Sequence, residues 1–225
     1  AHLPYASLDG IWLYRLEVLG IYIFLLLFLY YLKTRRFRNL VVCFSCLLCL
    51  GIYHTVMRWY DRPCPSLVFY NVRGCPAIHC IAEDGTSWLN YADTLSDKRR
   101  LQAVAANYWR RHQLLPPIEV TADCQNVDFC RHQQIVFYHG CRICMVTDNR
   151  WRNKSAASPL FINYMYLCKG YNGRLEELTG LFSPSCILLD ASLSDDRKQF
   201  FREECKRLHL HFITLSEEGS VRFLL

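Results

Sequence analysis

Two long uncharged stretches near the start of the chain constrain its fold more than any other feature. Residues 18–32 read VLGIYIFLLLFLYYL, and residues 40–57 read LVVCFSCLLCLGIYHTVM. A helix that crosses a bilayer core of about 30 Å needs ~20 mostly apolar residues, and each stretch approaches that length once its flanks are included. Buried helices of a water-soluble protein are the weaker alternative, because such helices normally keep a polar face. The sequence therefore predicts a transmembrane hairpin in residues 1–62, with helices at about 11–32 and 40–57.

The flanks of these stretches predict how the hairpin is oriented. Aromatic rings favour the headgroup level of a bilayer, and five lie near the ends of the stretches: Trp12, Tyr30, Tyr31, Trp59 and Tyr60. The intervening loop reads KTRRFRN, and the positive-inside rule places such a loop in the cytoplasm. The rest of the chain is then expected on the outer side of the membrane.

Charge is distributed unevenly along the chain. Residues 1–62 hold seven Lys or Arg against three Asp or Glu, whereas the remainder holds 19 against 17. Strong nucleic-acid binding usually needs a clustered positive surface, so the balanced remainder supports it only weakly. The basic excess instead reports on membrane topology.

Residues 66–225 are predicted to form a soluble α/β domain after a proline-rich linker, DRPCP, at 61–65. Runs rich in branched and aromatic residues predict strands at 67–72, 78–82, 87–91, 118–121, 134–138, 142–147, 161–168, 186–190, 211–215 and 221–225. Helical spacing predicts helices at 97–112 after Ser96, at 173–182 after Asn172, and from Ser194 to about Leu208. Strands that alternate with helices favour a sheet with helices packed on it.

Thirteen cysteines are present, but their spacing does not predict a metal site. Cys43, Cys46 and Cys49 lie in an apolar stretch, where they act as small hydrophobic residues. Cys141 and Cys144 form the one CxxC outside the membrane stretch. They lie in a predicted strand, where positions three apart point to opposite faces, so a structural role is favoured over zinc or redox chemistry. Disulfides among the remaining cysteines are left open.

Two other features of the sequence are candidate sites. Arg150, Trp151, Arg152 and Lys154 combine cations with an aromatic ring, which is how single strands are often held, although most such loops are ordinary surface. Asp190 ends an apolar strand, and we expect its carboxylate to accept backbone N–H bonds in a turn. Neither a glycine-rich phosphate loop nor a Gly-x-Ser-x-Gly elbow is present in the sequence.

Several segments carry a family resemblance. They are LPYASLDGIWLYRLE at the start, the helix pair, YLCKGYNGRLEELTGLFSPSCILLDAS, and ECKRLHLHFITLSEEGSVRF at the end. In order and context these segments resemble the C-terminal part of the ComEC family, the DNA-uptake channel of bacterial competence, and most of all its Bacteroidetes-type members. Because the chain begins Ala1-His2-Leu3-Pro4 without a methionine, we expect it to be a piece of a longer protein.

The resemblance implies a fold whose hydrolase motif is lost. Many members end in a metallo-β-lactamase-like domain with the motif Ser/Thr-His-x-Asp-x-Asp-His after a strand. At the matching positions Lys169 and Arg174 replace histidine, while Tyr171 and Gly173 replace aspartate. Two fixed positive charges would repel a divalent cation, which needs imidazole and carboxylate donors. We therefore expect a degenerate αββα sandwich with no metal, no cofactor and no catalytic residue.

The function that the resemblance implies is a non-catalytic C-terminal region of an inner-membrane channel for single-stranded DNA uptake. The expected partners are the rest of a multi-pass membrane protein, the lipid bilayer and single-stranded DNA, and the oligomeric state is left open. Lys169 and Arg174 then join Arg150, Trp151, Arg152 and Lys154 as candidate nucleic-acid contacts. The alternatives are a divergent membrane-anchored hydrolase of nuclease type and a plain binding or scaffold domain.

Overall fold

The computed structural model describes residues 13–92, 98–126 and 128–225. The chain divides into two compact units. One consists of Ala1–Arg62 with Tyr108–Gln113, and the other of Pro63–Asn107 with Leu114–Leu225. The predicted helix cap Ser96 and the first two residues of the predicted first span lie outside the described residues.

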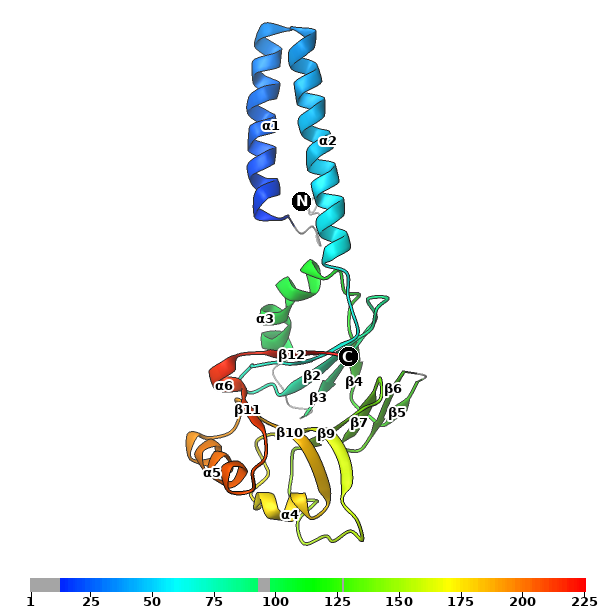
Figure 1. Cartoon of the computed structure of the whole chain (residues 1–225), viewed down its shortest axis with the longest axis vertical. Helices are drawn as coiled ribbons and strands as arrows, with labels where there is room; N and C mark the ends of the chain where they lie inside the picture. The colour runs from blue at the N-terminus through cyan, green and yellow to red at the C-terminus, as the bar shows by residue number, and fades with distance from the viewer. Residues whose placement is uncertain (1–12, 93–97, 127) are drawn as a thin grey trace, which may run out of the picture. The chain divides into compact units, whose positions relative to one another are not determined.

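The first unit contains the predicted helical hairpin, formed by α1 (Arg15–Thr34) and α2 (Phe37–Tyr60) (Figure 1). Helix α1 begins later than the expected residue 11, since the backbone N–H of Tyr14 donates to Glu17 Oε2 at 2.8 Å and caps the first turn. It ends at Thr34, and its C-cap is Arg35, whose φ of 47° is left-handed. Helix α2 extends beyond 40–57 at both ends. Both helices are long and apolar enough to cross a membrane.

A glycine sets the spacing of the two helices. A Cβ atom added at Gly20 of α1 would lie 2.2 Å from Leu50 Cδ2 of α2. The absence of a side chain at residue 20 therefore creates a notch that Leu50 fills, and it lets the backbones approach closely, as small residues do between membrane helices.

The second unit contains a five-stranded sheet in the order β12-β1-β2-β3-β4. Its strands are β1 (Ser66–Phe69), β2 (Ala77–Ile81), β3 (Ser87–Tyr91), β4 (Ile118–Val120) and β12 (Val221–Leu224). The first three pair antiparallel in sequence order, which confirms the predicted strands there. Strand β4 joins β3 in parallel, and β12 pairs antiparallel with β1.

A seven-stranded sheet in the order β11-β10-β9-β8-β7-β6-β5 packs beside the first. Its strands are β5 (Cys124–Gln125), β6 (Phe129–His132), β7 (Ile135–Tyr138), β8 (Cys141–Val146), β9 (Leu160–Leu167), β10 (Phe182–Leu189) and β11 (Phe212–Thr214). The β5–β6 ladder was not predicted, because its residues carry polar and basic side chains without an apolar run. Strand β10 begins at Phe182, four residues before the predicted start.

The helices of this unit are α3 (Lys98–Arg111, of which residues 108–111 belong to the first unit), α4 (Leu175–Thr179), α5 (Asp195–Arg207) and α6 (Leu215–Glu218). The predicted helix at 173–182 was too long, and its cap residue is Arg174 rather than Asn172. The chain leaves this helix early because Phe182 already pairs in β10. The predicted cap at Ser194 is confirmed, since its Oγ accepts from the Arg197 backbone N–H at 3.4 Å.

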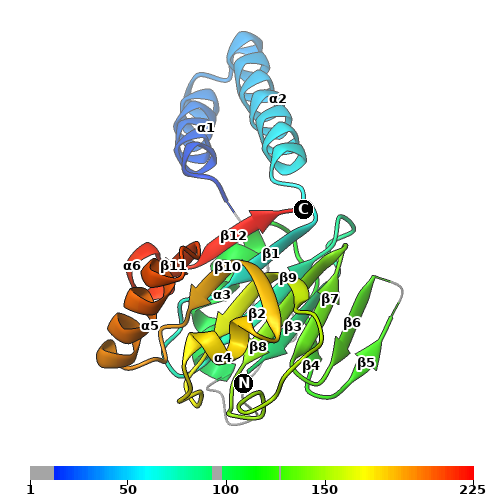
Figure 2. The same cartoon turned by 60° about the horizontal axis from the view of Figure 1, so that its bottom comes forward.

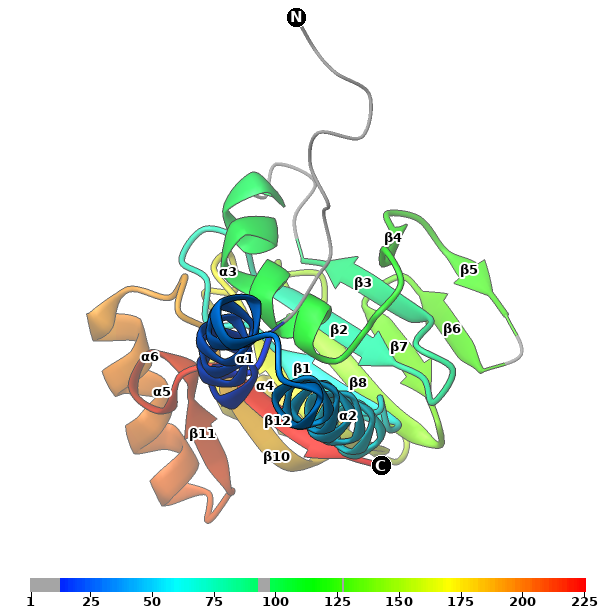
Figure 3. The same cartoon turned by 90° about the horizontal axis from the view of Figure 1, so that it is seen from above.

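The two sheets and their helices form four layers. Helix α3 lies over the first sheet, and α4 and α5 cover the far face of the second sheet (Figures 1, 2 and 3). One apolar cluster fills the space between the sheets, and another lies between the second sheet and α4 and α5. Cys141 packs against the first cluster and Cys144 belongs to the second, so this pair points to opposite faces as predicted. The order helix, sheet, sheet, helix is that of the expected sandwich.

Candidate functional site

Parallel strands place three loops at one edge of the second sheet. Strands β8, β9 and β10 run parallel, so their carboxyl ends meet at the same edge. The loops that leave these ends are residues 147–159, 168–174 and 190–194. Ligands of open α/β sheets commonly bind outside the carboxyl ends of parallel strands. The five basic residues and the one tryptophan that the sequence singles out all lie on the first two of these loops.

Backbone contacts tie the three loops together. The Asn172 N–H donates to Asn149 Oδ1 at 2.8 Å, and the Lys169 N–H donates to Ser192 Oγ at 3.1 Å. Gly170 has a φ of +117°, and a Cβ atom there would lie 2.2 Å from the Thr147 carbonyl oxygen. Only glycine fits this close approach, so the backbone of the edge is fixed by sequence as well as by hydrogen bonds.

Asp190 supports the edge from within the core. Its side chain is fully buried, and it accepts hydrogen bonds from the Tyr166 hydroxyl and from the Ser192 N–H, the latter at 2.7 Å. The prediction that this carboxylate accepts a backbone N–H bond in a turn is confirmed. Burial raises the pKa of Asp190, although its hydrogen bonds with Ser192 and Tyr166 oppose that shift. A carboxylate without contact to solvent holds the loop rather than reaching a ligand.

Arg197 of α5 anchors the loop that follows β9, a role that no pattern in the sequence indicates. Its Nη2 donates to the carbonyl oxygens of Tyr171 and Gly173 at 3.2 and 3.1 Å. Its guanidinium also lies over the rings of Phe200 and Phe201, at 4.8 and 4.5 Å from their centroids. Because its guanidinium is occupied by these contacts, Arg197 has a structural role and positions the loop.

The segment from Arg150 to Lys154 is more constrained than its sequence suggests. Arg150 pairs with Asp148, with Nη2 at 2.8 Å from Oδ2, and Arg152 Nε lies 3.3 Å from Glu177 Oε2. Burial raises the pKa of Asp148, but hydrogen bonds from Arg150 outweigh it and the pKa is lowered. Each arginine therefore lies beside its own carboxylate, which offsets much of its positive charge.

The ring of Trp151 packs on the apolar core instead of standing free. Its Nε1–H donates to Gln134 Oε1 at 2.5 Å, and the ring packs edge-on against Phe182 at 5.0 Å between centroids. Lys154 Nζ lies 5.3 Å from the centroid of the indole ring. Less of the indole is open for stacking on a base than the sequence suggested, while Lys154 stays exposed.

Lys169 and Arg174 are the most available cations of the edge. Both side chains are exposed, and within residues 13–92, 98–126 and 128–225 neither has a carboxylate within 4.0 Å. They flank the loop that Arg197 and Gly170 hold in shape. Such an arrangement suits an anion that makes several weak contacts, such as a phosphate of a polymer.

The donor set at the edge does not fit a divalent metal. The loop after β9 offers lysine, tyrosine, asparagine and arginine, and one buried cysteine, Cys168, where coordination needs imidazole or carboxylate. Across the described residues, no group of three or more His, Cys, Asp or Glu side chains is placed to hold a metal ion.

Comparison with known proteins identifies the second unit. A family model described as ComEC C-terminal domain matches residues 67–225. No curated protein and no solved structure matches the chain. The matched range begins in β1 and includes both sheets together with the loop edge described above.

Proposed function

The chain belongs to the ComEC C-terminal domain family, and on that basis we propose that it is a non-catalytic C-terminal region of a channel for single-stranded DNA uptake in competence. The family match carries this proposal, because it covers the whole of the two-sheet domain. In this proposal the hairpin spans the bacterial inner membrane as part of a larger multi-pass protein. The domain then lies on the outer side, as the basic loop between α1 and α2 predicts.

The loop edge supports a binding role for the domain. Lys169 and Arg174 are exposed cations on a loop whose backbone is fixed, and Lys154 lies on the neighbouring loop. Phosphate contacts need exposed positive charge and little else, which makes these residues the first candidates to contact DNA. Arg150 and Arg152 rank behind them because each is paired with a carboxylate.

Single-strand binding by the purified chain tests this role. The variant Lys169→Glu/Arg174→Glu is expected to bind an oligonucleotide more weakly and to lower the salt slope by roughly 0.7 for each lost phosphate contact. The matched control is Lys206→Glu/Arg99→Glu, which reverses two exposed cations on α5 and α3. Transformation with the same variants should follow the binding.

Three outcomes separate the alternatives. Equal binding and equal transformation by the two double variants would remove Lys169 and Arg174 from the mechanism. No salt-dependent binding by the unmodified chain would favour a scaffold domain. Stoichiometric zinc or manganese in the purified chain, with hydrolysis that depends on it, would favour a divergent hydrolase.

A further inference from the structure

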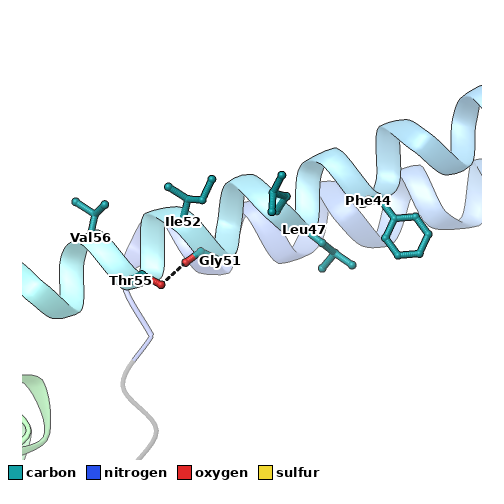
Figure 4. A pocket seen from close by; sticks show the side chains of 7 residues that line it. Phe44, Leu47, Gly51, Ile52, Thr55 and Val56 are labelled. Carbon is teal, nitrogen blue, oxygen red and sulfur yellow. Dashed lines mark hydrogen bonds between the residues drawn. The ribbon is translucent and has the colours of Figure 1, made fainter.

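An open apolar groove runs along one side of α2. It has a volume of about 600 Å³ and follows residues at helical spacing from Phe44 to Val56 (Figure 4). Leu47, Leu48 and Ile52 are among its lining residues. A Cβ atom added at Gly51 would meet nothing within 4 Å, so this glycine leaves an open notch in the helix surface.

The groove differs from the face of α2 that packs on α1. There, the notch at Gly20 is filled by Leu50, whereas the notch at Gly51 holds no side chain of the described residues. The hydroxyl of Thr55 donates to the Gly51 carbonyl oxygen at 2.8 Å, so that polar group is already satisfied (Figure 4). The groove therefore offers apolar surface to an apolar ligand.

A basic hollow of about 510 Å³ adjoins the groove at the end of α2. His54 and Arg58 are four residues apart and lie on one side of α2, and both line the hollow together with Trp59. Arg62, which follows the end of the helix, also lines it. The Arg58 guanidinium donates to the neutral Gln113 side chain at 2.7 Å and keeps its full charge.

The nearby carboxylates do not neutralise this hollow. Glu17 is bonded to His54 Nδ1 at 2.7 Å, and Asp61 is bonded to Arg111, with Oδ2 at 3.1 Å from Nε. Neither acid lines the hollow. For Arg62, no carboxylate lies within 4.0 Å among the residues that the structure describes. Two guanidinium groups therefore face a hollow that is lined by no carboxylate of the described residues.

The groove and the hollow form one continuous surface, since Thr55 and Val56 line both. From Phe44 to Val56 a helix rises about 18 Å at 1.5 Å per residue. Half of a bilayer core of about 30 Å is ~15 Å, so the groove has the length of one leaflet. Trp59, 67% exposed, then lies at the headgroup level.

We propose that this face of α2 binds one anionic phospholipid, with its phosphate between Arg58 and Arg62 and an acyl chain in the groove over Gly51. The proposal rests on the membrane-spanning hairpin of the proposed function. A further transmembrane helix of apolar residues would cover the groove but supply no anion to the two arginines. A DNA phosphate would match the arginines but leave the groove empty. A phospholipid satisfies both parts.

Lipid titration of the chain in an uncharged detergent, read by native mass spectrometry, tests the phosphate site. We expect phosphatidylglycerol to bind in preference to phosphatidylcholine. The variant Arg58→Gln/Arg62→Gln should weaken that binding by about 30-fold, from the usual contribution of two basic residues at an anionic membrane surface. The variant Arg35→Gln/Arg38→Gln removes the same charge at the other end of the hairpin and should leave binding unchanged.

A second pair of variants tests the groove. Gly51→Leu fills the open notch and should weaken phosphatidylglycerol binding, whereas Cys49→Leu puts the same side chain at an exposed position of α2 outside the groove and should not. Glycerol phosphate without acyl chains should fail to displace the bound lipid. Displacement by glycerol phosphate, or equal effects of the two variants, would overturn the acyl-chain part of the site.

The remaining outcomes distinguish failure of the lipid site from failure of the proposed function on which it rests. Equal binding by the two arginine double variants, or no preference for phosphatidylglycerol in a chain that inserts, would overturn the lipid site alone. Displacement of the lipid by a single-stranded oligonucleotide would assign the arginines to DNA instead. Release of the chain from carbonate-washed membranes would overturn the spanning hairpin and the lipid site together. The proposed DNA contacts of Lys169 and Arg174 would not be affected, because the oligonucleotide-binding experiment tests them separately.

Discussion

The two units of the chain bury opposite kinds of side chain. In the hairpin, Leu26 and Leu48 are 68% and 66% exposed, while Glu17 and Asp61 are only 4% and 5% exposed. In the two-sheet domain many large apolar side chains, such as Phe201, Phe69 and Tyr166, are fully buried. Each arrangement would be unstable in the other's surroundings, because apolar surface avoids water and unpaired charge avoids lipid.

The difference shows that the two units are stabilised by different forces. The domain gains its stability from apolar area removed from water. A hairpin that spans a bilayer, as proposed above, cannot use that gain, and its helices instead pack closely at Gly20 and make polar contacts at one end. Variants that remove one force at a time should therefore affect one unit and spare the other.

The largest expected effect follows from truncation of a core ring. Phe201→Ala removes a fully buried side chain between α5 and the second sheet and should destabilise the domain by about 3–5 kcal/mol. Leu26→Ala, the matched truncation on the exposed face of α1, should leave the unfolding midpoint in detergent unchanged. Chemical denaturation monitored by tryptophan fluorescence measures both, and equal effects would contradict the comparison.

A smaller effect is expected from acid. Burial lowers the pKa of His79 in the domain to about 3, so the folded state keeps this imidazole neutral while the unfolded state protonates it near pH 6.5. Between these values the unfolded state binds more protons, and stability therefore falls as the pH falls. From pH 7 to pH 5 the loss from this group should be about 2 kcal/mol. Thermal unfolding across that range measures it, and His79→Gln should flatten the dependence.

The smallest effect concerns the polar end of the hairpin. Asp61 accepts hydrogen bonds from the Tyr14 hydroxyl at 2.7 Å and from Arg111 Nε at 3.1 Å. Burial raises the pKa of Asp61, but these bonds outweigh it and the pKa is lowered. Asp61→Asn should destabilise this end by about 1 kcal/mol, since Arg111 is half exposed and partly screened by water.

Amide hydrogen exchange in residues 14–18 measures the destabilisation that Asp61→Asn causes. Exchange there should become several-fold faster in Asp61→Asn, while amides of β9 and β10 keep their protection. Asp195→Asn, the same substitution at a fully exposed carboxylate, is the control. Protection unchanged in residues 14–18 would show that close packing alone holds the hairpin.

Most of the fold was predictable wherever a pattern is local. The two helices of the hairpin were found from uninterrupted apolar runs, and strands such as β3 and β8 from branched and aromatic residues. The helix capped by Ser194 followed from its acidic first turn. The β5–β6 ladder and the short α4 were missed or misjudged because pairing with distant strands, rather than local preference, decides their extent.

The candidate site divides in the same way. The sequence singled out the six residues, although it placed Arg174 in a helix rather than on the loop, and it predicted that Asp190 would hold a turn. It could not tell that Arg150 and Arg152 are paired while Lys169 and Arg174 stand exposed. It also gave no sign of Arg197, whose partners lie 24 and 26 residues away along the chain.

The sequence by itself determined the apolar spans, the alternation of strands and helices, and the absence of His, Asp and Glu from the loop after β9, because each is a property of neighbouring residues. Only the tertiary structure decided which cations remain free and which glycine notch remains open. Charge pairing and groove formation depend on side chains that meet across long stretches of chain, and the folded backbone alone brings those side chains together.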